Sequence, residues 1–114
     1  MSLKLLITGA EGMLGKNIAL SSKFKTYKLY TTSRRKLDLK NIGKVEKFIK
    51  KINPDIVIHC AAKVGGILDN IENPLDYIND NFLINYNVIN TCYKLKIKKL
   101  INIGSSCAYP KNYT

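Results

Sequence analysis

The sequence predicts an α/β fold in which parallel strands alternate with helices that cover both faces of one sheet. Short apolar runs typical of strands lie at residues 3–8, 27–31, 56–60 and 100–103. Stretches with helical spacing separate them, at residues 13–22, 41–52 and 74–96. This alternation indicates a doubly wound parallel sheet, and the length favours one domain, residues 1–114.

The elements of the first half have recognisable ends. The first strand ends at Gly9, and β-branched and aromatic residues predict the second strand. The first helix is expected to turn four apolar side chains toward the sheet, Met13, Leu14, Ile18 and Leu20. The second helix has one apolar face, formed by Ile42, Val45, Phe48, Ile49 and Ile52. Pro54 stops it.

The second half holds the longest predicted helix. Gly65 and Gly66 mark a loop after the third strand, and Pro74 favours a helix start. The helix is expected to run to about Lys96, with one side formed by Leu75, Ile78, Phe82, Asn85, Ile89 and Cys92. The last strand leads into Gly104-Ser105-Ser106.

The composition favours a globular protein of the cytoplasm. A formal charge of +11 comes with 17 Lys but only 2 Arg, which indicates solvated helix faces, so no nucleic-acid partner is expected. No apolar run approaches the roughly 18–20 residues of a membrane span, and the first residues do not resemble a signal peptide, so no membrane contact is expected. Cys60, Cys92 and Cys107 are spaced for neither a metal site nor a disulfide framework, and their odd number fits a reducing compartment.

The loop between the first strand and the first helix contains three spaced glycines, Gly9, Gly12 and Gly15. One permits a tight turn, one lets the backbone approach phosphate, and one allows the helix to pack closely on the strand. Met13 and Leu14 begin the helix, whose first amides face the same point. The loop therefore predicts a site for the pyrophosphate of a dinucleotide, with an ordinary glycine-rich turn as the alternative.

The end of the second strand indicates which dinucleotide is bound. An NAD site usually places Asp or Glu there for the ribose 2′-hydroxyl, but here Arg34 and Arg35 follow the strand. A guanidinium pairs bidentately with phosphate, so Arg34 favours NADP through its 2′-phosphate, and an exposed basic turn is the alternative. Asp38, before Leu39, either accepts a hydrogen bond from the adenine amino group or caps the helix that starts near Asn41.

Two further segments carry a family resemblance. They are Ala61-Ala62-Lys63-Val64-Gly65-Gly66-Ile67 and Gly104-Ser105-Ser106-Cys107-Ala108-Tyr109-Pro110-Lys111. Together with the glycine loop and Asp38-Leu39, they resemble the extended short-chain dehydrogenase/reductase family, and within it the GDP-L-fucose synthase branch. Residues 74–78, with Asn81 and Asn87 after them, are similar to that branch too. The resemblance implies a Rossmann-type fold, incomplete at the C-terminus because the family's substrate domain is absent.

The resemblance also implies a two-stage reaction on a GDP-sugar. GDP-4-keto-6-deoxy-mannose is epimerised beside its ketone and then reduced by NADPH to GDP-L-fucose. Ser105 matches the serine that hydrogen-bonds the reacting carbonyl oxygen, and Cys107 matches the acid/base of the epimerisation. Ala61, Ala62 and Lys63 match positions that line the cofactor, and the full-length form is expected to be a homodimer.

These site residues also have plainer interpretations. Ser105 could end a strand and bond backbone, Cys107 could be a small buried apolar side chain, and Lys63 one more lysine of a lysine-rich chain. The chain also departs from the family. Glu11 stands where some relatives carry a basic residue that reaches the 2′-phosphate.

The family's Tyr-x-x-x-Lys pair is the more serious departure, because no tyrosine of the chain precedes a lysine at that spacing. Positioned proton donation contributes about 10²–10⁴-fold to a rate, so the chain alone is expected not to reduce a ketone at an enzymatic rate. Three functions stay open: part of a nucleotide-sugar epimerase/reductase, an NADP-binding module without turnover, and a nucleic-acid-binding protein. An uncovered sheet edge is expected to leave the isolated chain marginally stable.

Overall fold

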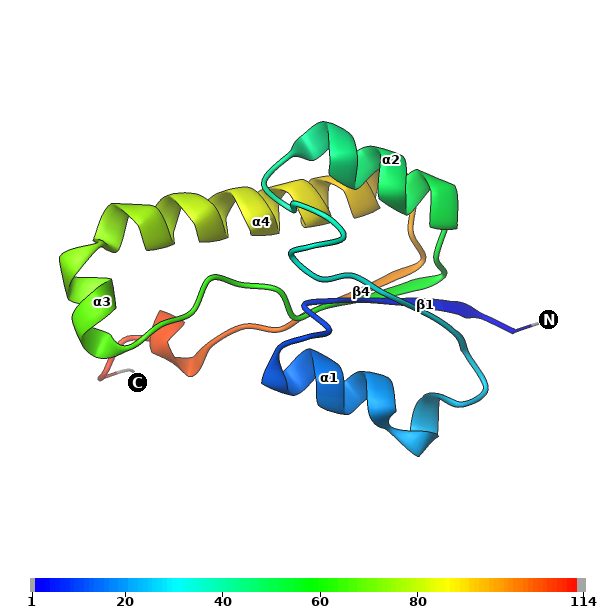
Figure 1. The fold of residues 1–114 in the computed structure, drawn as a ribbon, viewed down its shortest axis with the longest axis horizontal. Helices are drawn as coiled ribbons and strands as arrows, with labels where there is room; N and C mark the ends of the chain where they lie inside the picture. Colours follow the sequence, from blue (N-terminus) through cyan, green and yellow to red (C-terminus); the bar gives the residue numbers. More distant parts are fainter. Residues whose placement is uncertain (1, 113–114) are drawn as a thin grey trace.

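The computed structural model describes residues 2–112 and has the predicted architecture. Four parallel strands form one sheet in the order β2-β1-β3-β4, with bounds β1 Lys4–Thr8, β2 Lys28–Thr31, β3 Ile56–His59 and β4 Lys99–Asn102. Figure 1 shows α1 Met13–Leu20 below the sheet, and α2 Ile42–Ile52 and α4 Pro74–Lys94 above it. The predicted doubly wound parallel sheet is therefore confirmed.

The strand order reverses beside β1, since β2 lies on one side of β1 and β3 on the other. In open α/β sheets the carboxyl ends of the strands at such a reversal are the usual ligand site. The core forms two layers because side chains alternate along each strand. Leu6 and Val57 pack toward α2 and α4, whereas Leu5, Ile7 and Ile58 pack toward α1.

The predicted inner face of α1 is largely wrong. Only Ile18 of its four residues packs against the sheet, while Met13 is 85% exposed and Leu20 75% exposed. Gly15 takes the inner position instead, because a Cβ there would lie 2.2 Å from the carbonyl oxygen of Gly9. The close approach of the helix to the strand requires a glycine at this position. A search for apolar side chains at helical spacing ignores glycine.

The side of α4 that the helical spacing selected is only partly its buried side. Cys92 is buried as expected, but Leu75, Ile78 and Phe82 are 64–70% exposed. The buried positions are Tyr77, Asn87, Val88, Thr91 and Cys92. Polar side chains of α4 bind the loops at the ends of the strands, so its buried side is partly polar. A pattern based on hydrophobicity alone therefore selected the outer side of the helix.

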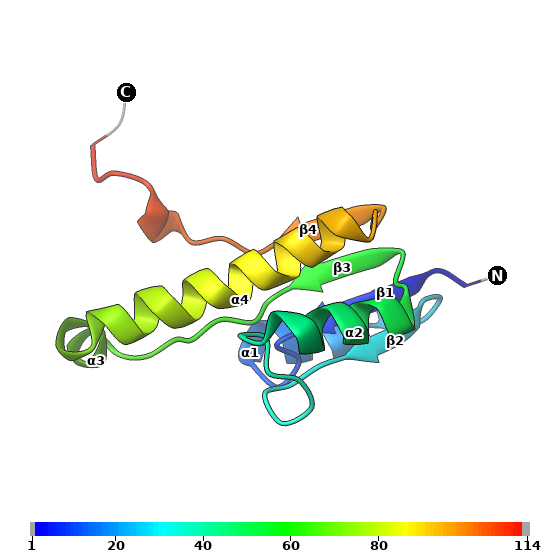
Figure 2. The same cartoon turned by 90° about the horizontal axis from the view of Figure 1, so that it is seen from above.

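Three short elements were not predicted. The helix α3, Ile67–Glu72, follows Gly66 in the segment expected to be only a loop. Two 3₁₀ turns, η1 Ser22–Phe24 and η2 Ser106–Ala108, follow α1 and β4. Figure 2 shows that η2 lies on the segment that continues past β4.

A buried polar junction joins the carboxyl ends of β1 and β3. Thr8 pairs with His59 in the strand register, and both side chains are at most 2% exposed. The Thr8 hydroxyl oxygen accepts the backbone N–H groups of Cys60 at 3.1 Å and Ala61 at 3.2 Å. It also lies 2.6 Å from Nδ1 of His59. The Thr8 side chain thus fixes the path of the backbone as it leaves β3.

The junction determines the tautomer of His59. The Thr8 hydroxyl already accepts two N–H groups, so its own hydrogen points to Nδ1, which is the unprotonated nitrogen. Nε2 then carries the hydrogen and donates it to Oδ1 of Asn85 at 2.9 Å. Burial lowers the pKa of His59 from its usual 6.5, against a smaller raising effect of the Asn85 hydrogen bond. The imidazole is therefore neutral in the folded protein at neutral pH.

We predict that Thr8→Val lowers the free energy of unfolding by about 2–3 kcal/mol, because two N–H groups lose their acceptor at unchanged side-chain shape. Thr91→Val is the matched control, since Thr91 is fully buried and its hydroxyl has no hydrogen-bond partner within residues 2–112. Its unfolding free energy should stay equal or rise. Urea unfolding of both variants measures this, and equal losses would contradict the role given to Thr8.

Candidate functional site

A cavity of about 710 Å³ opens at the carboxyl ends of β1, β2 and β3, where the strand order reverses. Four segments form its walls: the glycine loop, the stretch after β2, the stretch after β3, and the middle of α4. Every residue that the sequence suggested for the cofactor lines it: Gly9, Gly12, Met13, Leu14, Gly15, Arg34, Asp38, Leu39, Ala61, Ala62 and Lys63. The fold therefore brings these scattered residues together, while their contact with a cofactor stays a prediction.

The glycine loop forms the floor of this cavity. Gly9 has a φ of +66°, and a Cβ there would lie 2.7 Å from the backbone nitrogen of Ala61. Gly12 is the N-cap of α1, and no side chain caps the first turn. The leading N–H groups of the helix are therefore available to an anion at this point. This is the geometry that a pyrophosphate requires.

The two arginines that follow β2 differ in their position relative to the cavity. Arg34 is exposed and lines the cavity, whereas Arg35 is exposed but is not among its lining residues. Thr32 also lines the cavity, and its buried hydroxyl has no hydrogen-bond partner in the part of the chain that the structure describes. Glu11 of the glycine loop also lines the cavity and adds a negative charge. The Thr32 hydroxyl, which has no partner within residues 2–112, and the exposed guanidinium of Arg34 both suit a ribose that carries a phosphate.

Of the two roles left open for Asp38, the helix cap is wrong. The N-cap of α2 is Asn41, whose side chain accepts the N–H of Lys44 at 3.0 Å. Asp38 instead accepts the N–H of Lys40 at 3.0 Å in a local turn. Its carboxylate lines the cavity beside the buried Leu39, so the adenine contact stays a prediction.

Several lining residues escaped the sequence analysis, among them Asp80 and Ile84 on α4. They were missed because they lie outside the side of the helix that the apolar spacing selected. Asp80, Ile84 and Val88 follow one another at steps of four, which is the signal that could have found them. Asp80 pairs with Lys63 at 3.3 Å and with Lys40 at 3.8 Å. These partly exposed pairs contribute about 0–1 kcal/mol each, and a stronger ligand charge could displace them.

Lys63 is held at the cavity by more than this ion pair. Its ammonium lies 5.1 Å from the ring centre of Tyr77, within the range of a cation–π contact. The Tyr77 hydroxyl donates to Asp69, which raises the pKa of Tyr77 and lowers that of Asp69. The lysine that sequence resemblance selected therefore has defined partners, in contrast to a freely solvated one.

Ser105 and Cys107 lie after β4, in and beside η2. The Ser105 hydroxyl oxygen accepts the N–H of Cys107 at 3.2 Å. Both residues are exposed, so the alternative of a buried apolar Cys107 is wrong. Neither lines the cavity, and their catalytic roles remain predictions. Cys60 does line the cavity, but burial raises its thiol pKa, which makes it a weak nucleophile.

No cluster of three or more His, Cys, Asp or Glu side chains suited to a metal occurs within residues 2–112. In the same range, no helix has the length and apolar character needed to cross a membrane. What the site offers is two separated anion positions, at the start of α1 and at Arg34, with an apolar surface at Leu39 and Ile84 near them. That arrangement suits an extended ligand with a pyrophosphate, a flat ring and a second phosphate.

Known proteins resemble this chain in sequence and in fold. GDP-L-colitose synthase of Yersinia pseudotuberculosis is 41% identical over 110 residues, which cover 96% of this chain and 36% of that protein. GDP-L-fucose synthase of Azorhizobium caulinodans is 38% identical over 107 residues, covering 94% of this chain and 34% of that protein. The chain thus spans about a third of the length of these relatives.

Solved structures agree with the sequence relatives. A GDP-D-glycero-L-gluco-heptose synthase from Campylobacter jejuni, crystallised in the presence of NADPH, superposes with a TM-score of 0.90 at 32% identity, over 99% of this chain and 33% of that one. A GDP-L-fucose synthetase from Naegleria fowleri bound to NADP gives 0.81 at 27% identity, over 98% and 33%. The model of the NAD dependent epimerase/dehydratase family matches residues 5–114. This chain therefore belongs to the NAD dependent epimerase/dehydratase family and has its Rossmann-type nucleotide-binding fold.

Proposed function

We propose that this chain supplies the NADP-binding part of an epimerase/reductase that converts GDP-4-keto-6-deoxy-mannose to GDP-L-fucose. The observation that carries the proposal is the single cavity that contains the glycine loop, Arg34, Leu39 and the Ala61–Lys63 segment. The relatives named as GDP-sugar synthases match over nearly all of this chain. A cytoplasmic reaction is part of the proposal, since three free thiols fit a reducing compartment.

In the proposed complex, the first amides of α1 hold the pyrophosphate and Arg34 holds the 2′-phosphate. Leu39 packs against the adenine, and Asp38 accepts a hydrogen bond from its amino group. When bound, NADPH supplies the hydride that reduces the ketone. Lys63 and the two alanines before it line the remainder of the cofactor.

The segment after β4 is proposed to serve the sugar. Ser105 accepts one N–H through its oxygen, which leaves its hydroxyl hydrogen free to donate to the ketone oxygen. That hydrogen bond favours removal of a proton from a neighbouring carbon, because negative charge develops on the oxygen. Cys107 is proposed to take part in this proton exchange, which inverts the carbon before the ketone is reduced.

In the full-length protein, we expect Cys107→Ser to slow epimerisation by about 10²–10⁴-fold, the usual contribution of a positioned acid or base. Deuterium uptake from heavy water into the sugar, read by mass spectrometry, measures this step. A 4-keto sugar that already has the product configuration should still be reduced by NADPH at the original rate. Unchanged deuterium uptake would contradict the role of Cys107.

A related GDP-sugar is the second candidate substrate, because the similarity to GDP-L-colitose synthase is as high as that to the fucose synthases. Comparing kcat/KM for GDP-4-keto sugars that differ in their ring hydroxyls distinguishes these candidates. A third possibility is an NADP-binding module without turnover, which the missing Tyr-x-x-x-Lys pair favours for the 114-residue chain. That chain should bind NADPH without oxidising it when a 4-keto sugar is added.

The cofactor assignment has a matched pair of variants. Arg34→Ala should raise the Kd for NADPH by roughly 10–100-fold and leave the Kd for NADH unchanged, because a charged hydrogen bond contributes about 1.5–3 kcal/mol. Arg35→Ala removes the same charge one residue away, outside the cavity, and should change neither affinity. Calorimetric titration measures both. Tighter binding of NADH than NADPH by the unaltered protein would refute the assignment.

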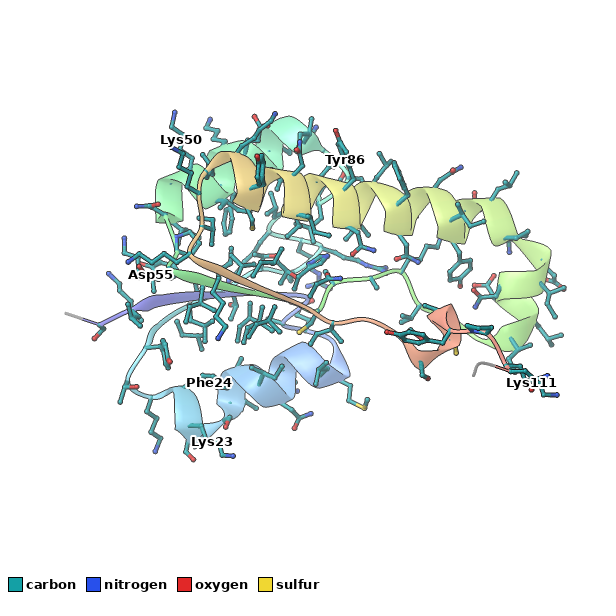
Figure 3. All side chains as sticks on the ribbon, turned by 180° about the vertical axis from the view of Figure 1, so that it is seen from behind. Lys23, Phe24, Lys50, Asp55, Tyr86 and Lys111 are labelled. Carbon is teal, nitrogen blue, oxygen red and sulfur yellow. The ribbon has the colours of Figure 1, made fainter. Side chains whose placement is uncertain are left out.

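We further propose that the full-length protein is a homodimer. The side of α4 that faces away from the sheet carries exposed apolar residues at steps of three and four: Leu75, Ile78, Phe82, Tyr86, Ile89 and Tyr93. Figure 3 shows Tyr86 on this outer side, and its ring stacks on Phe82 with centres 5.9 Å apart. A continuous apolar stripe of this kind marks an interface.

Phe82→Glu should convert the full-length dimer to a monomer, because it places a charge in the middle of the apolar stripe. Leu20→Glu on α1 is the control, since Leu20 is similarly exposed but lies on the opposite side of the sheet. It should leave the mass unchanged. Sedimentation equilibrium gives the masses, and a monomeric unaltered protein would disprove the proposal.

A further inference from the structure

The side of α4 that faces the strand ends carries amide side chains. Asn81, Asn85 and Asn87 all point toward the ends of the strands and bind groups there. Figure 2 shows α4 beside the segment that leaves β3, over the length of that segment. Each amide reaches a different wall of the cavity.

Asn81 binds the backbone of a single residue, Lys63, through both of its polar atoms. Its Oδ1 accepts the backbone N–H of Lys63 at 2.7 Å, and its Nδ2 donates to the Lys63 carbonyl at 3.0 Å. The segment around Lys63 belongs to no helix or strand. Within residues 2–112, these are the hydrogen bonds that its N–H and carbonyl make. Only an amide supplies a donor and an acceptor in this geometry.

The other two amides hold the neighbouring walls. Asn85 accepts from His59 and so supports the junction that positions Cys60 and Ala61. Asn87 is 3% exposed, and its Nδ2 donates to the carbonyl of Leu39 at 2.8 Å. One helix thus contacts the stretch after β2, the end of β3 and the stretch after β3.

We propose that Asn81, Asn85 and Asn87 are positioning residues, which fix the cavity walls at Lys63, His59 and Leu39 in the arrangement that the cofactor requires. None of the three lines the cavity, so each acts through the backbone or side chain that it binds. The inference rests on the proposed binding of NADP at this cavity. It adds that α4 determines the shape of the site in advance of binding, which lowers the ordering cost of association.

Asn81 provides the sharpest test, because it is half-buried at the rim and its removal should not unfold the chain. Asn81→Ala deletes both hydrogen bonds, and Asn79→Ala makes the same replacement two residues away at an exposed position of α4. Alanine improves helix propensity equally at both sites. Any difference between the variants therefore reports the contacts of Asn81.

The first measurement is amide hydrogen exchange without cofactor. In Asn81→Ala, the Lys63 amide should exchange roughly tenfold faster or more, whereas Val57 in β3 should keep its protection. Asn79→Ala should match the unaltered protein at both amides. Unchanged exchange at Lys63 would overturn the role of Asn81 whatever the protein binds.

The second measurement is NADPH affinity together with the melting temperature of the free protein. Asn81→Ala should raise the Kd about 5- to 20-fold with no fall in melting temperature, a separation that a merely structural role would not produce. Faster exchange at Lys63 with an unchanged Kd would overturn the positioning role alone. If the unaltered protein does not bind NADPH, the proposed cofactor fails, and the exchange result still decides whether Asn81 holds the loop.

Discussion

The buried hydroxyl of Thr8 makes the contacts on which the cavity at the strand ends depends. It sits where the two central strands end, and it accepts the first two N–H groups of the chain that leaves β3. Without an acceptor these groups would be buried and unpaired, at a cost of about 1–3 kcal/mol each. The neutral imidazole of His59 takes the remaining hydrogen, so every polar atom at this junction is satisfied.

The glycine loop begins at this junction, and the junction determines its path. Gly9 comes immediately after Thr8, and its positive φ turns the chain against the backbone of Ala61 with no room for a Cβ. The same turn brings Gly15 against Gly9, which sets α1 close to the sheet with its first N–H groups at the cavity. The position of the proposed phosphate site is thus a consequence of backbone packing at Gly9 and Gly15.

Helix α4 was predicted from its spacing, but its apolar side is not its buried side. Its outer side is the more apolar one, and its inner side carries asparagines that bind loop backbone. A helix that lies over strand ends must satisfy the polar groups of the loops there, so its buried face is partly polar. The apolar spacing therefore selected Leu75, Ile78 and Phe82, which lie on the surface.

The sequence by itself determined the alternation of the four strands with α1, α2 and α4, the glycine loop, and many of the residues that line the cavity. These depend on local spacing and on motifs that are contiguous in the chain. The tertiary structure decided that Asn41, and not Asp38, caps α2, and that Asp38 accepts the N–H of Lys40 beside the cavity. It also decided the inner faces of α1 and α4. Such choices depend on contacts between residues far apart in the sequence, where a glycine or an amide fits a position that hydrophobicity would give to another residue.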